Sequence, residues 1–297
     1  MANFTTNPED PKFTLGDYDF SDDFFINDEI IIPTVENGIA SPIEQINSDF
    51  KNHRNFLLVG HLNARSVPRH IQEMERILHE TRFDVVGVSE TFLKKHTPKD
   101  LCSIAGFKFF RNDRTSSAGG GVGIFVREDL NPKVIKLPHN HSQPEMLFIE
   151  IQTKSGKVAI GTIYKPPKIP YGVFATIQES LAFVSTKYNH TIICGDFNIN
   201  CLDPESLPTR FFQLNVLEPL GFSQIIDKPT RVTSNTSTLL DLILVSNVDC
   251  VKKCNAVDIP GVSDHHLVYM AYMFKNLSSN LKLLLSVISK ILIRMTF

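Results

Sequence analysis

The chain has 297 residues, of which 42% are hydrophobic and 21% charged, and its formal net charge is -2 at pH 7. This length allows one large globular domain or two small ones, and the near-neutral charge excludes a uniformly basic nucleic-acid-binding chain. The charge is nevertheless uneven, because residues 1–49 contain many acidic side chains and one basic residue, Lys12. The remaining body is therefore mildly basic, which suits a polyanionic partner.

The cysteines and the N-terminal segment indicate the compartment. Five cysteines are scattered along the chain, and the first residues lack the basic and apolar pattern of a signal peptide. Both features predict a reduced intracellular protein with ordinary thiols. Cys250 and Cys254 have no second pair nearby that would complete a metal site. Residues 1–50 are acidic and show no periodicity, so we expect a disordered leader.

The ordered part is expected to begin with a buried strand over 56–60, and polar residues that include Asn63 follow it. A helix is predicted next, and a second strand over 83–88 leads into Glu90. A strand, helix and strand form an α/β unit, and such units bind ligands at the C-terminal ends of their strands. Asn63 and Glu90 are therefore expected to share one crevice.

Residues 107–127 are predicted to form two short strands around the glycine run 119–121. The run lacks the Gly-Lys-Ser/Thr signature and the helix of a phosphate-binding loop, so a tight turn or bulge is the better interpretation. Strands over 147–151 and 158–163 then predict a hairpin. Prolines end the second strand shortly after Tyr164, so its hydroxyl is expected to face the cleft from a strand edge.

A helix over 174–188 leads into a β-branched strand that ends at a glycine, with Asp196 and Asn198 directly after it. Strand residues alternate between faces, so these two side chains are expected to look into one cleft. There a carboxylate can orient a nucleophile, and an amide can donate a hydrogen bond to a phosphate oxygen. A capping turn, in which Asp and Asn satisfy loop backbone, is the alternative interpretation.

A short helix is predicted over 211–220, and an apolar strand over 239–245 follows. Asp241 lies inside this strand, where an unpaired carboxylate costs several kcal/mol, so we expect it to be paired or metal-bound. Asp264 and His265 then offer a carboxylate and an imidazole in one loop before a final strand. The second half of the chain therefore contains its own candidate site residues.

Together these strand-end motifs resemble the endonuclease/exonuclease/phosphatase superfamily, and more narrowly the endonuclease domain of LINE-type (non-LTR) retrotransposons. The resemblance covers residues 55–275 and rests on short motifs at 62–66, 89–91, 164–167, 195–198, 240–244 and 263–265. It implies the α/β class and a DNase I-like, four-layer sandwich, in which two packed mixed β-sheets are flanked by helices. Residues 1–50 and 276–297 would lie outside this domain.

The resemblance also implies a role for each motif residue. Glu90 would bind Mg²⁺, or Mn²⁺ in its place, with Asn63 beside it, which agrees with the oxygen ligands that these ions prefer. The implied catalytic residues are Asp196, Asn198, Tyr164, Asp241, His265 and Asp264. Asp196 would activate the attacking water, Asn198 and His265 would hold the phosphate, and Tyr164 would position it or assist the leaving group.

Supporting residues are implied in the same way. Asp241 would orient His265 or Tyr164, and Asp264 and Ser263 would support the histidine. The Thr- and Ser-rich segment 230–238 corresponds to a hairpin loop that such enzymes lay against DNA. Thr230, Arg231 and Ser263 would therefore bind substrate, mainly through its phosphates.

The implied function is a Mg²⁺-dependent DNA endonuclease that leaves 3′-hydroxyl and 5′-phosphate ends, in the nucleus, where the hydroxyl would prime reverse transcription. The alternatives are a phosphatase or phosphodiesterase of the same fold, acting on inositol phosphates or sphingomyelin, and an inactive nucleic-acid-binding remnant. The apolar stretch 281–297 is interrupted by Lys282, Lys290 and Arg294, and it is too short and charged for a membrane span. We therefore expect no membrane association, and the sequence indicates no protein partner. A truncated or frame-shifted element copy is the favoured interpretation of this tail, and an amphipathic anchor is the alternative.

Overall fold

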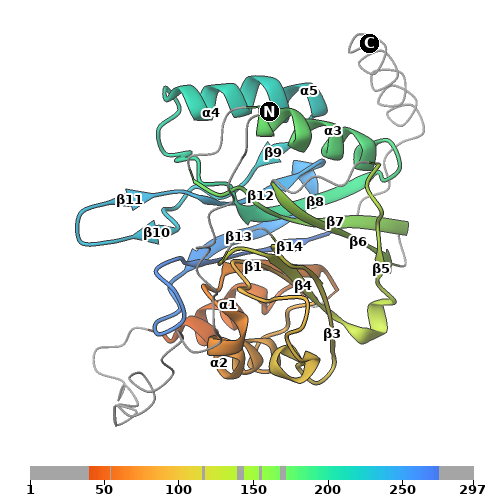
Figure 1. Ribbon diagram of the computed structural model, residues 1–297, viewed down its shortest axis with the longest axis vertical. Coiled ribbons are helices and arrows are strands. Elements are labelled where there is room, and N and C mark those ends of the chain that lie inside the picture. Colours follow the sequence, from red (N-terminus) through yellow and green to blue (C-terminus); the bar gives the residue numbers. More distant parts are fainter. Residues whose placement is uncertain are drawn as a thin grey trace, which may run out of the picture. The chain divides into compact units, whose positions relative to one another are not determined.

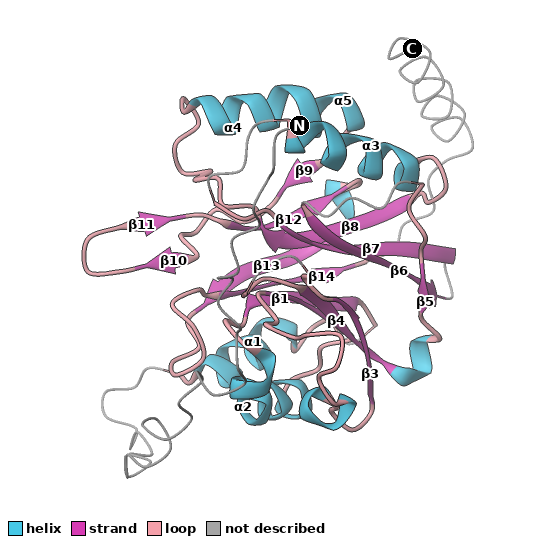
Figure 2. Ribbon diagram, viewed as in Figure 1, coloured by secondary structure: helices cyan, strands magenta, loops and turns pink. Residues whose placement is uncertain are grey.

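The computed structural model describes residues 40–53, 55–115, 118–138, 144–153, 156–167 and 172–273 (Figures 1 and 2). The helices are α1 (Pro42–Phe50), α2 (Val67–Glu80), α3 (Val173–Ser185), α4 (Leu207–Phe212) and α5 (Glu218–Leu220), with a π-helical turn at Gln213–Leu217. Short 3₁₀ turns lie at Lys99–Cys102, Glu128–Leu130 and Val248–Cys250. The strands are β1 (Leu57–Asn63), β2 (Val85–Ser89), β3 (Phe107–Asn112), β4 (Val122–Arg127), β5 (Lys133–Val134), β6 (Glu145–Thr153), β7 (Gly156–Tyr164), β8 (His190–Asp196), β9 (Ser223–Gln224), β10 (Arg231–Val232), β11 (Ser237–Thr238), β12 (Asp241–Val245), β13 (Val251–Val257) and β14 (Leu267–Tyr272).

Two six-stranded sheets form the centre of the domain, with the strand orders β13-β14-β1-β2-β4-β3 and β5-β6-β7-β8-β12-β9. Each contains one parallel pair, β1 with β2 and β7 with β8, beside antiparallel neighbours. Helices α1 and α2 cover the outer face of the first sheet, and α3, α4 and α5 cover that of the second (Figure 1). The predicted four-layer α/β sandwich is confirmed.

Apolar side chains fill the space between the sheets, among them Val59 of the first sheet with Ile160 and Ile192 of the second. Because side chains alternate along a strand, the neighbour of Val59, Leu58, faces the other way and packs with Phe50 under the helices. Both faces of the central strands are therefore buried. This double burial explains why these strands appear in the sequence as nearly continuous apolar runs.

The domain begins earlier than the sequence predicts, because residues 42–50 form α1 instead of the end of a disordered leader. The Ser41 side chain accepts a hydrogen bond from the Glu44 backbone, and the Glu44 side chain accepts one from Ser41 in return. Ile46 and Phe50, one turn apart, are fully buried. The expected start near residue 55 is therefore corrected to Ser41, the N-cap of α1. The rest of the predicted leader, 1–39, and the predicted tail, 276–297, lie outside the described residues.

Two further elements differ from expectation. The strand β13 was not predicted, because it is a partly exposed edge strand and a bulge between Val251 and Lys253 breaks its alternation. The predicted helix over 211–220 starts earlier, at Leu207, and its middle widens into the π turn. It ends as predicted at Gly221, whose φ of 68° is the left-handed conformation that glycine adopts without strain. Within the described residues no helix is long and apolar enough to cross a membrane.

The docking of α1 can be tested through Phe50. This side chain packs edge-on against Phe83 and Tyr269, with ring centroids 5.4 and 5.3 Å apart. We expect Phe50→Ala to lower the free energy of unfolding by about 3–5 kcal/mol, because it leaves a cavity between α1 and the sheet. Urea unfolding of the whole chain measures this change. The exposed Lys51→Ala should change stability by no more than about 0.5 kcal/mol, and equal effects of both variants would contradict the docking.

Candidate functional site

Most of the predicted site residues lie where strands of both sheets end or begin at one edge. Asn63 ends β1 and Tyr164 ends β7, while Asp196 ends β8 and Asp241 begins β12. The register pairs Tyr164 and Asp241 with Asp196 on either side. Parallel strands end at the same edge, and antiparallel partners begin there. The topology therefore gathers polar side chains at one end of the sandwich.

A first hydrogen-bond network links the two sheets through Asn63. Its Nδ2 donates to Oε1 of Glu90 at 3.1 Å and to Oδ2 of Asp196 at 2.9 Å. The Tyr164 hydroxyl donates to the same Glu90 oxygen at 2.9 Å. Asn63 and Asp196 are almost completely buried, whereas Glu90 is partly exposed. Asn63 and Glu90 therefore lie in direct contact, and the Tyr164 hydroxyl bonds to the same Glu90 oxygen.

The backbone around Asp196 differs from a simple alternating strand. A Cβ at Gly195 would lie 1.9 Å from the carbonyl oxygen of Ile163, so only glycine allows β7 and β8 to approach here. Asn198 lies beyond the strand end with a φ of 47°, and its backbone N–H donates to Oδ1 of Asp196 at 2.9 Å. Its side chain donates to the Lys165 carbonyl at 3.0 Å. A tight turn therefore places Asn198 beside Asp196, and the alternation argument does not apply to it.

A second network is formed by Asp241 and His265. Nδ1 of His265 donates to Oδ2 of Asp241 at 2.7 Å, and both side chains are buried. The Ser263 hydroxyl accepts the backbone N–H of His265 at 3.1 Å. Thr230 is fully buried, and its hydroxyl accepts the backbone N–H groups of Leu240 and Asp241 at 3.0 and 2.9 Å. The backbone at both Asp241 and His265 is therefore held in place by a neighbouring hydroxyl. The position of the Thr230 hydroxyl supports the strand start rather than the predicted phosphate contact.

The two networks meet. A carboxylate oxygen of Asp196, a carboxylate oxygen of Asp241 and a ring nitrogen of His265 all lie within 4.8 Å of one another. These residues come from β8, β12 and the loop before β14, which belongs to the other sheet. The sequence predicts this convergence, and the structure brings the three side chains together.

Burial and neighbouring charges shift two of the acid–base groups. Burial, together with the charge of Asp241, raises the pKa of Asp196 to about 7, although His265 and hydrogen bonds from Asn198 and Asn63 oppose the rise. Burial alone would lower the pKa of His265, but the charge and hydrogen bond of Asp241 outweigh it and raise this pKa to about 9. The site therefore combines a carboxylate that takes up a proton near neutral pH with an imidazolium.

Asp264 lies at the rim and binds two arginines. Its Oδ1 is 2.9 Å from Nη1 of Arg65, and its Oδ2 accepts a hydrogen bond from Nε of Arg231 at 2.9 Å. Burial alone would raise the pKa of Asp264, but the bond from Arg231 and the charge of Arg65 outweigh it and lower this pKa. Asp264 therefore joins the turn after β1 to the β10–β11 hairpin, and it supports His265 through charge rather than through a hydrogen bond.

Strained backbone is concentrated at this edge. Arg65, Ser66, Glu90 and Asn198 have positive φ angles of 46°, 121°, 51° and 47°. Non-glycine residues adopt such conformations rarely and at a cost of about 1–3 kcal/mol each, and they cluster at functional sites. All four lie one to three residues beyond the ends of β1, β2 or β8. The strain independently marks this edge as the functional end of the domain.

The donor chemistry of the first network fits a divalent ion such as Mg²⁺. Glu90 offers a carboxylate whose two hydrogen bonds both use Oε1 and leave Oε2 available, and Asn63 offers an amide oxygen next to it. The buried carboxylates Asp196 and Asp241 add negative charge that a cation would balance. The Asp196, Asp241 and His265 cluster fits less well, because Asn63 and Asn198 already bond both oxygens of Asp196, and the Asp241–His265 bond uses Oδ2 of Asp241 and Nδ1 of His265.

The sequence did not reveal an ion pair that lies beside Tyr164. Nε of Arg114 pairs with Oε1 of Glu145, and the guanidinium lies over the Tyr164 ring, 5.6 Å from its centroid. The other Glu145 oxygen accepts the Gly121 backbone N–H at 2.6 Å. The glycine run is therefore a tight turn, as expected, that wraps this ion pair. One sequence signal could have indicated this pair: Glu145 is an acidic residue at the start of an apolar strand, just as Glu90 is one at the end of another.

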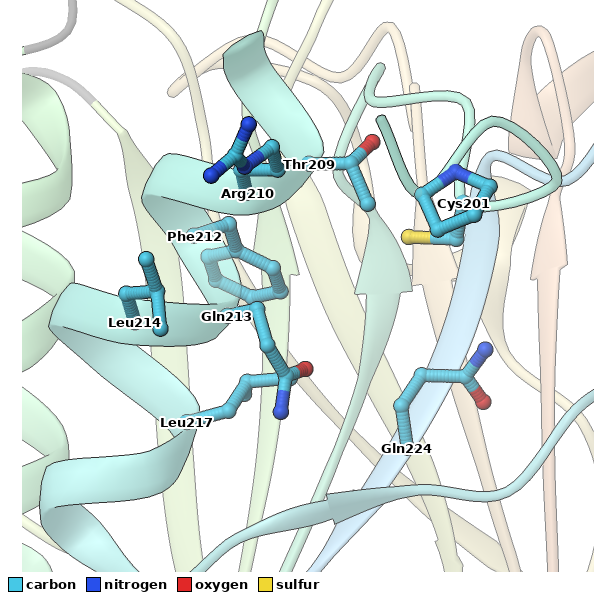
Figure 3. Close-up of a pocket in the computed structure, with 9 residues that line it drawn as sticks. Cys201, Thr209, Arg210, Phe212, Gln213, Leu214, Leu217 and Gln224 are labelled. Atoms are coloured by element: carbon cyan, nitrogen blue, oxygen red, sulfur yellow. The ribbon is translucent and has the colours of Figure 1, made fainter. Parts of the chain in front are cut away.

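A pocket of about 380 Å³ lies elsewhere in the domain, on the side of the second sheet that the helices cover (Figure 3). The residues that line it are Cys201, Pro204, Thr209, Arg210, Phe212, Gln213, Leu214, Leu217 and Gln224. None of them is a carboxylate or a predicted site residue. The acid–base chemistry therefore belongs to the strand-end site and not to this pocket.

The raised pKa of His265 gives a direct test of the second network. We expect an NMR titration of the His265 ring to give a pKa of about 9 in the wild type, and Asp241→Asn to lower it to the ordinary value of about 6.5 or below, because burial then dominates. The folded protein holds this proton more tightly than the unfolded chain. The resulting stability is therefore fully present below pH of about 6.5 and is lost as the pH rises through about 9.

Asp264→Asn is the control for this titration, because Asp264 acts on His265 through charge alone and as the weakest of the stated causes. It should lower the His265 pKa by less than Asp241→Asn does. A wild-type pKa near the ordinary value, or an unchanged pKa in Asp241→Asn, would refute the pairing as the source of the shift.

Comparisons with known proteins agree with this architecture. Residues 51–265 match the Endonuclease/Exonuclease/phosphatase family model. The AP endonuclease LMAP from Leishmania major has a TM-score of 0.65 at 15% identity, and the match covers 80% of this chain and 97% of that one. The 3′-5′ exonuclease NExo from Neisseria meningitidis has a TM-score of 0.61 at 20% identity, with 73% and 100% covered. A search of curated protein sequences finds no match.

The endonuclease domain of TRAS1, a telomere-specific non-LTR retrotransposon, is a further neighbour, with a TM-score of 0.57 at 15% identity and with 74% and 100% covered. At such identities these likenesses establish the fold alone. They do not single out the retrotransposon branch from the AP endonucleases and exonucleases. The family model, however, spans most of the chain, and the chain therefore belongs to the endonuclease/exonuclease/phosphatase family.

Proposed function

We propose that this protein is a Mg²⁺-dependent DNA endonuclease that hydrolyses a phosphodiester bond and leaves 3′-hydroxyl and 5′-phosphate ends. The observation that supports this most is the convergence of Asp196, Asp241 and His265 within 4.8 Å, next to the Glu90–Asn63 pair. Such a site combines a base, a charged hydrogen-bond donor and oxygen ligands for a cation. These are the components that phosphodiester hydrolysis requires.

In this proposal Asp196 accepts a proton from the attacking water. Its pKa of about 7 makes it a base suited to neutral pH, and bonds from Asn63 and Asn198 hold both of its oxygens in place. His265 has the opposite role. Asp241 engages its Nδ1, which leaves Nε2 to donate to a phosphate oxygen and stabilise the charge that develops there.

Glu90 and Asn63 would hold the metal ion, which when bound supplies positive charge for the phosphate oxygens. Burial, together with the charge of Glu90, raises the pKa of Tyr164 above its ordinary value, so the phenol stays protonated as a donor. Its hydroxyl orients Glu90, and Arg114 over its ring fixes the ring position. Asn198, held by the Lys165 carbonyl, stands beside the base.

The β10–β11 hairpin supports DNA as the substrate. It extends away from the sheets (Figure 1). Its base is joined to the site by an isolated antiparallel β-bridge between the backbones of Arg231 and His265, and the His266 N–H donates to the Thr230 carbonyl at 2.6 Å. Arg65 and Arg231 add positive charge at the rim, half and about a third exposed. A hairpin and cations next to a phosphodiester site suit contacts with the DNA backbone and groove.

The proposal also includes a cellular location and a role in retrotransposition. A DNA substrate implies a nuclear location, and the strand-end motifs resemble LINE-type elements, in which the 3′-hydroxyl would prime reverse transcription. The main rival is a phosphatase or phosphodiesterase that acts on smaller phosphate esters at the same site. The other rival is a domain that binds nucleic acid and does not cut it.

The activity can be tested on supercoiled plasmid. We expect the full chain to nick it with Mg²⁺ and to stop in EDTA. We expect Asp196→Ala and His265→Ala to reduce the nicking rate by about 10²-fold or more, because they remove the base and the charged donor. His266→Ala, a change at the next residue, should nick close to the wild-type rate.

Two outcomes would overturn the proposal. Release of phosphate from inositol phosphates, or of head groups from sphingomyelin, without nicking would favour the phosphatase or phosphodiesterase. Equal DNA affinity of the wild type and His265→Ala, with no nick from either, would favour the inactive remnant.

The role of the hairpin can be tested separately from the chemistry. Residues 233–236 form its exposed tip, closed by the Thr233 N–H to Thr236 carbonyl bond of 2.9 Å. Replacing this tip with Asn-Gly, which supports a two-residue turn, should raise KM for plasmid nicking about tenfold, which is ~1.4 kcal/mol of binding. Hydrolysis of bis(p-nitrophenyl) phosphate should be unchanged. A parallel loss with the small substrate would show that the change damages the site itself.

A further inference from the structure

His61 is a buried histidine to which the proposed reaction assigns no role. It lies in the middle of β1, two residues before Asn63 and on the same face of the strand, and it is fully buried. Leu57 and Val59 share this face and pack in the core between the sheets. An imidazole at such a position is exceptional, because an apolar side chain would suit the surrounding core better.

The imidazole of His61 lies next to Asp241. Its Nδ1 is 3.6 Å from Oδ1 of Asp241, while Oδ2 of the same carboxylate accepts the bond from His265. This separation is too long for a hydrogen bond but is within ion-pair distance. Within the described part of the chain, neither ring nitrogen of His61 has a hydrogen-bond partner, and Oδ1 of Asp241 has none either. Unpaired donor and acceptor thus face each other, and a small side-chain shift would join them.

The ring chemistry of His61 suits this pairing. A neutral imidazole carries one N–H and one lone pair, so it donates from one of its two nitrogens only. The negatively charged Oδ1 is the acceptor that Nδ1 faces, so the tautomer with its proton on Nδ1 is the stable one.

We propose that His61 is a positioning residue that holds Oδ1 of Asp241, so that this carboxylate lies between two imidazoles and directs Oδ2 toward His265. The inference rests on the proposed function, because it assigns His61 to the pair that orients the charged donor. A carboxylate fixed at both oxygens cannot rotate, and the His265 ring then keeps its Nε2 aimed at the substrate. Groups that orient a catalytic residue in this way commonly change activity 10–100-fold.

The test compares His61→Leu with His61→Asn in the full chain. Leucine fills the space but cannot donate, whereas the Asn side-chain N–H₂ replaces the Nδ1–H donor. We expect His61→Leu to lower kcat about 10–100-fold with little change in KM for plasmid nicking. His61→Asn should retain most of the activity. The urea midpoint of His61→Asn should stay close to that of the wild type, whereas His61→Leu should lower it, because the buried Oδ1 of Asp241 then loses the donor that faces it.

Double variants distinguish positioning from packing. If His61 acts through Asp241, adding His61→Leu to Asp241→Asn should cause no further loss of kcat. Adding it to Tyr164→Phe should multiply the two losses, because the Tyr164 hydroxyl bonds Glu90 and not Asp241. Thr191→Val is the matched control, since the fully buried Thr191 hydroxyl likewise has no partner in the described residues but lies at the other end of β8. It should leave kcat unchanged.

A wild-type kcat in His61→Leu would overturn the inference, and so would a His61→Asn variant that recovers no kcat. The inference would also fail if His61→Leu lowered the urea midpoint and reduced kcat equally in the wild-type and Asp241→Asn backgrounds. If the wild type cuts no DNA, the proposed function fails, and the unfolding midpoints still decide the contact. Midpoint shifts of His61→Leu and Asp241→Asn that are not additive would support the contact, and additive shifts would refute it.

Discussion

Two buried carboxylates, Asp196 and Asp241, set the constraint on which the site depends. Ionised carboxylates away from water are costly unless charges and hydrogen bonds compensate them. Asp241 is compensated by His265, and Asp196 by Asn63 and the backbone of Asn198. The compensation of Asp196 is incomplete, so its pKa is raised, whereas the pairing with Asp241 itself raises the pKa of His265. The same imbalance that costs stability makes this end of the domain suited to proton transfer and to binding a cation next to phosphate.

The sandwich makes this arrangement possible because each sheet has a parallel pair at its centre. The ends of β1 and β2 and of β7 and β8 bring their polar residues to one edge. The antiparallel strands β12 and β14 start there and add Asp241 and His265. Strained turns after β1, β2 and β8 aim these side chains inward. The packed core between the sheets is rigid enough to hold that strain, which a mobile loop would release.

Family membership and the buried site indicate the hydrolysis of phosphate esters. They do not indicate which substrate is used, which depends on the residues around the site. Structural neighbours include an AP endonuclease, a 3′-5′ exonuclease and a retrotransposon endonuclease domain, all with similar sandwiches. One fold therefore serves several substrates. In this chain the rim differs from the buried centre, because Asp264 joins Arg65 and Arg231 at the base of an exposed hairpin. Substrate preference should depend on this rim, and the chemistry on the centre.

The sequence alone determined most of the strands, their order along the chain, the α/β class and the chemical types of the site residues. Apolar runs that end in Asn63, Glu90, Asp196 and Asp241 are local signals, because a strand and the polar residue at its end are neighbours in the chain. Tertiary structure decided the rest. Partners distant in sequence determine the burial of α1, the edge strand β13, the side-chain position of Asn198 against the Lys165 carbonyl, the structural position of Thr230 and the contact of His61 with Asp241. No local pattern encodes them, because burial and pairing exist only once the sheets have packed.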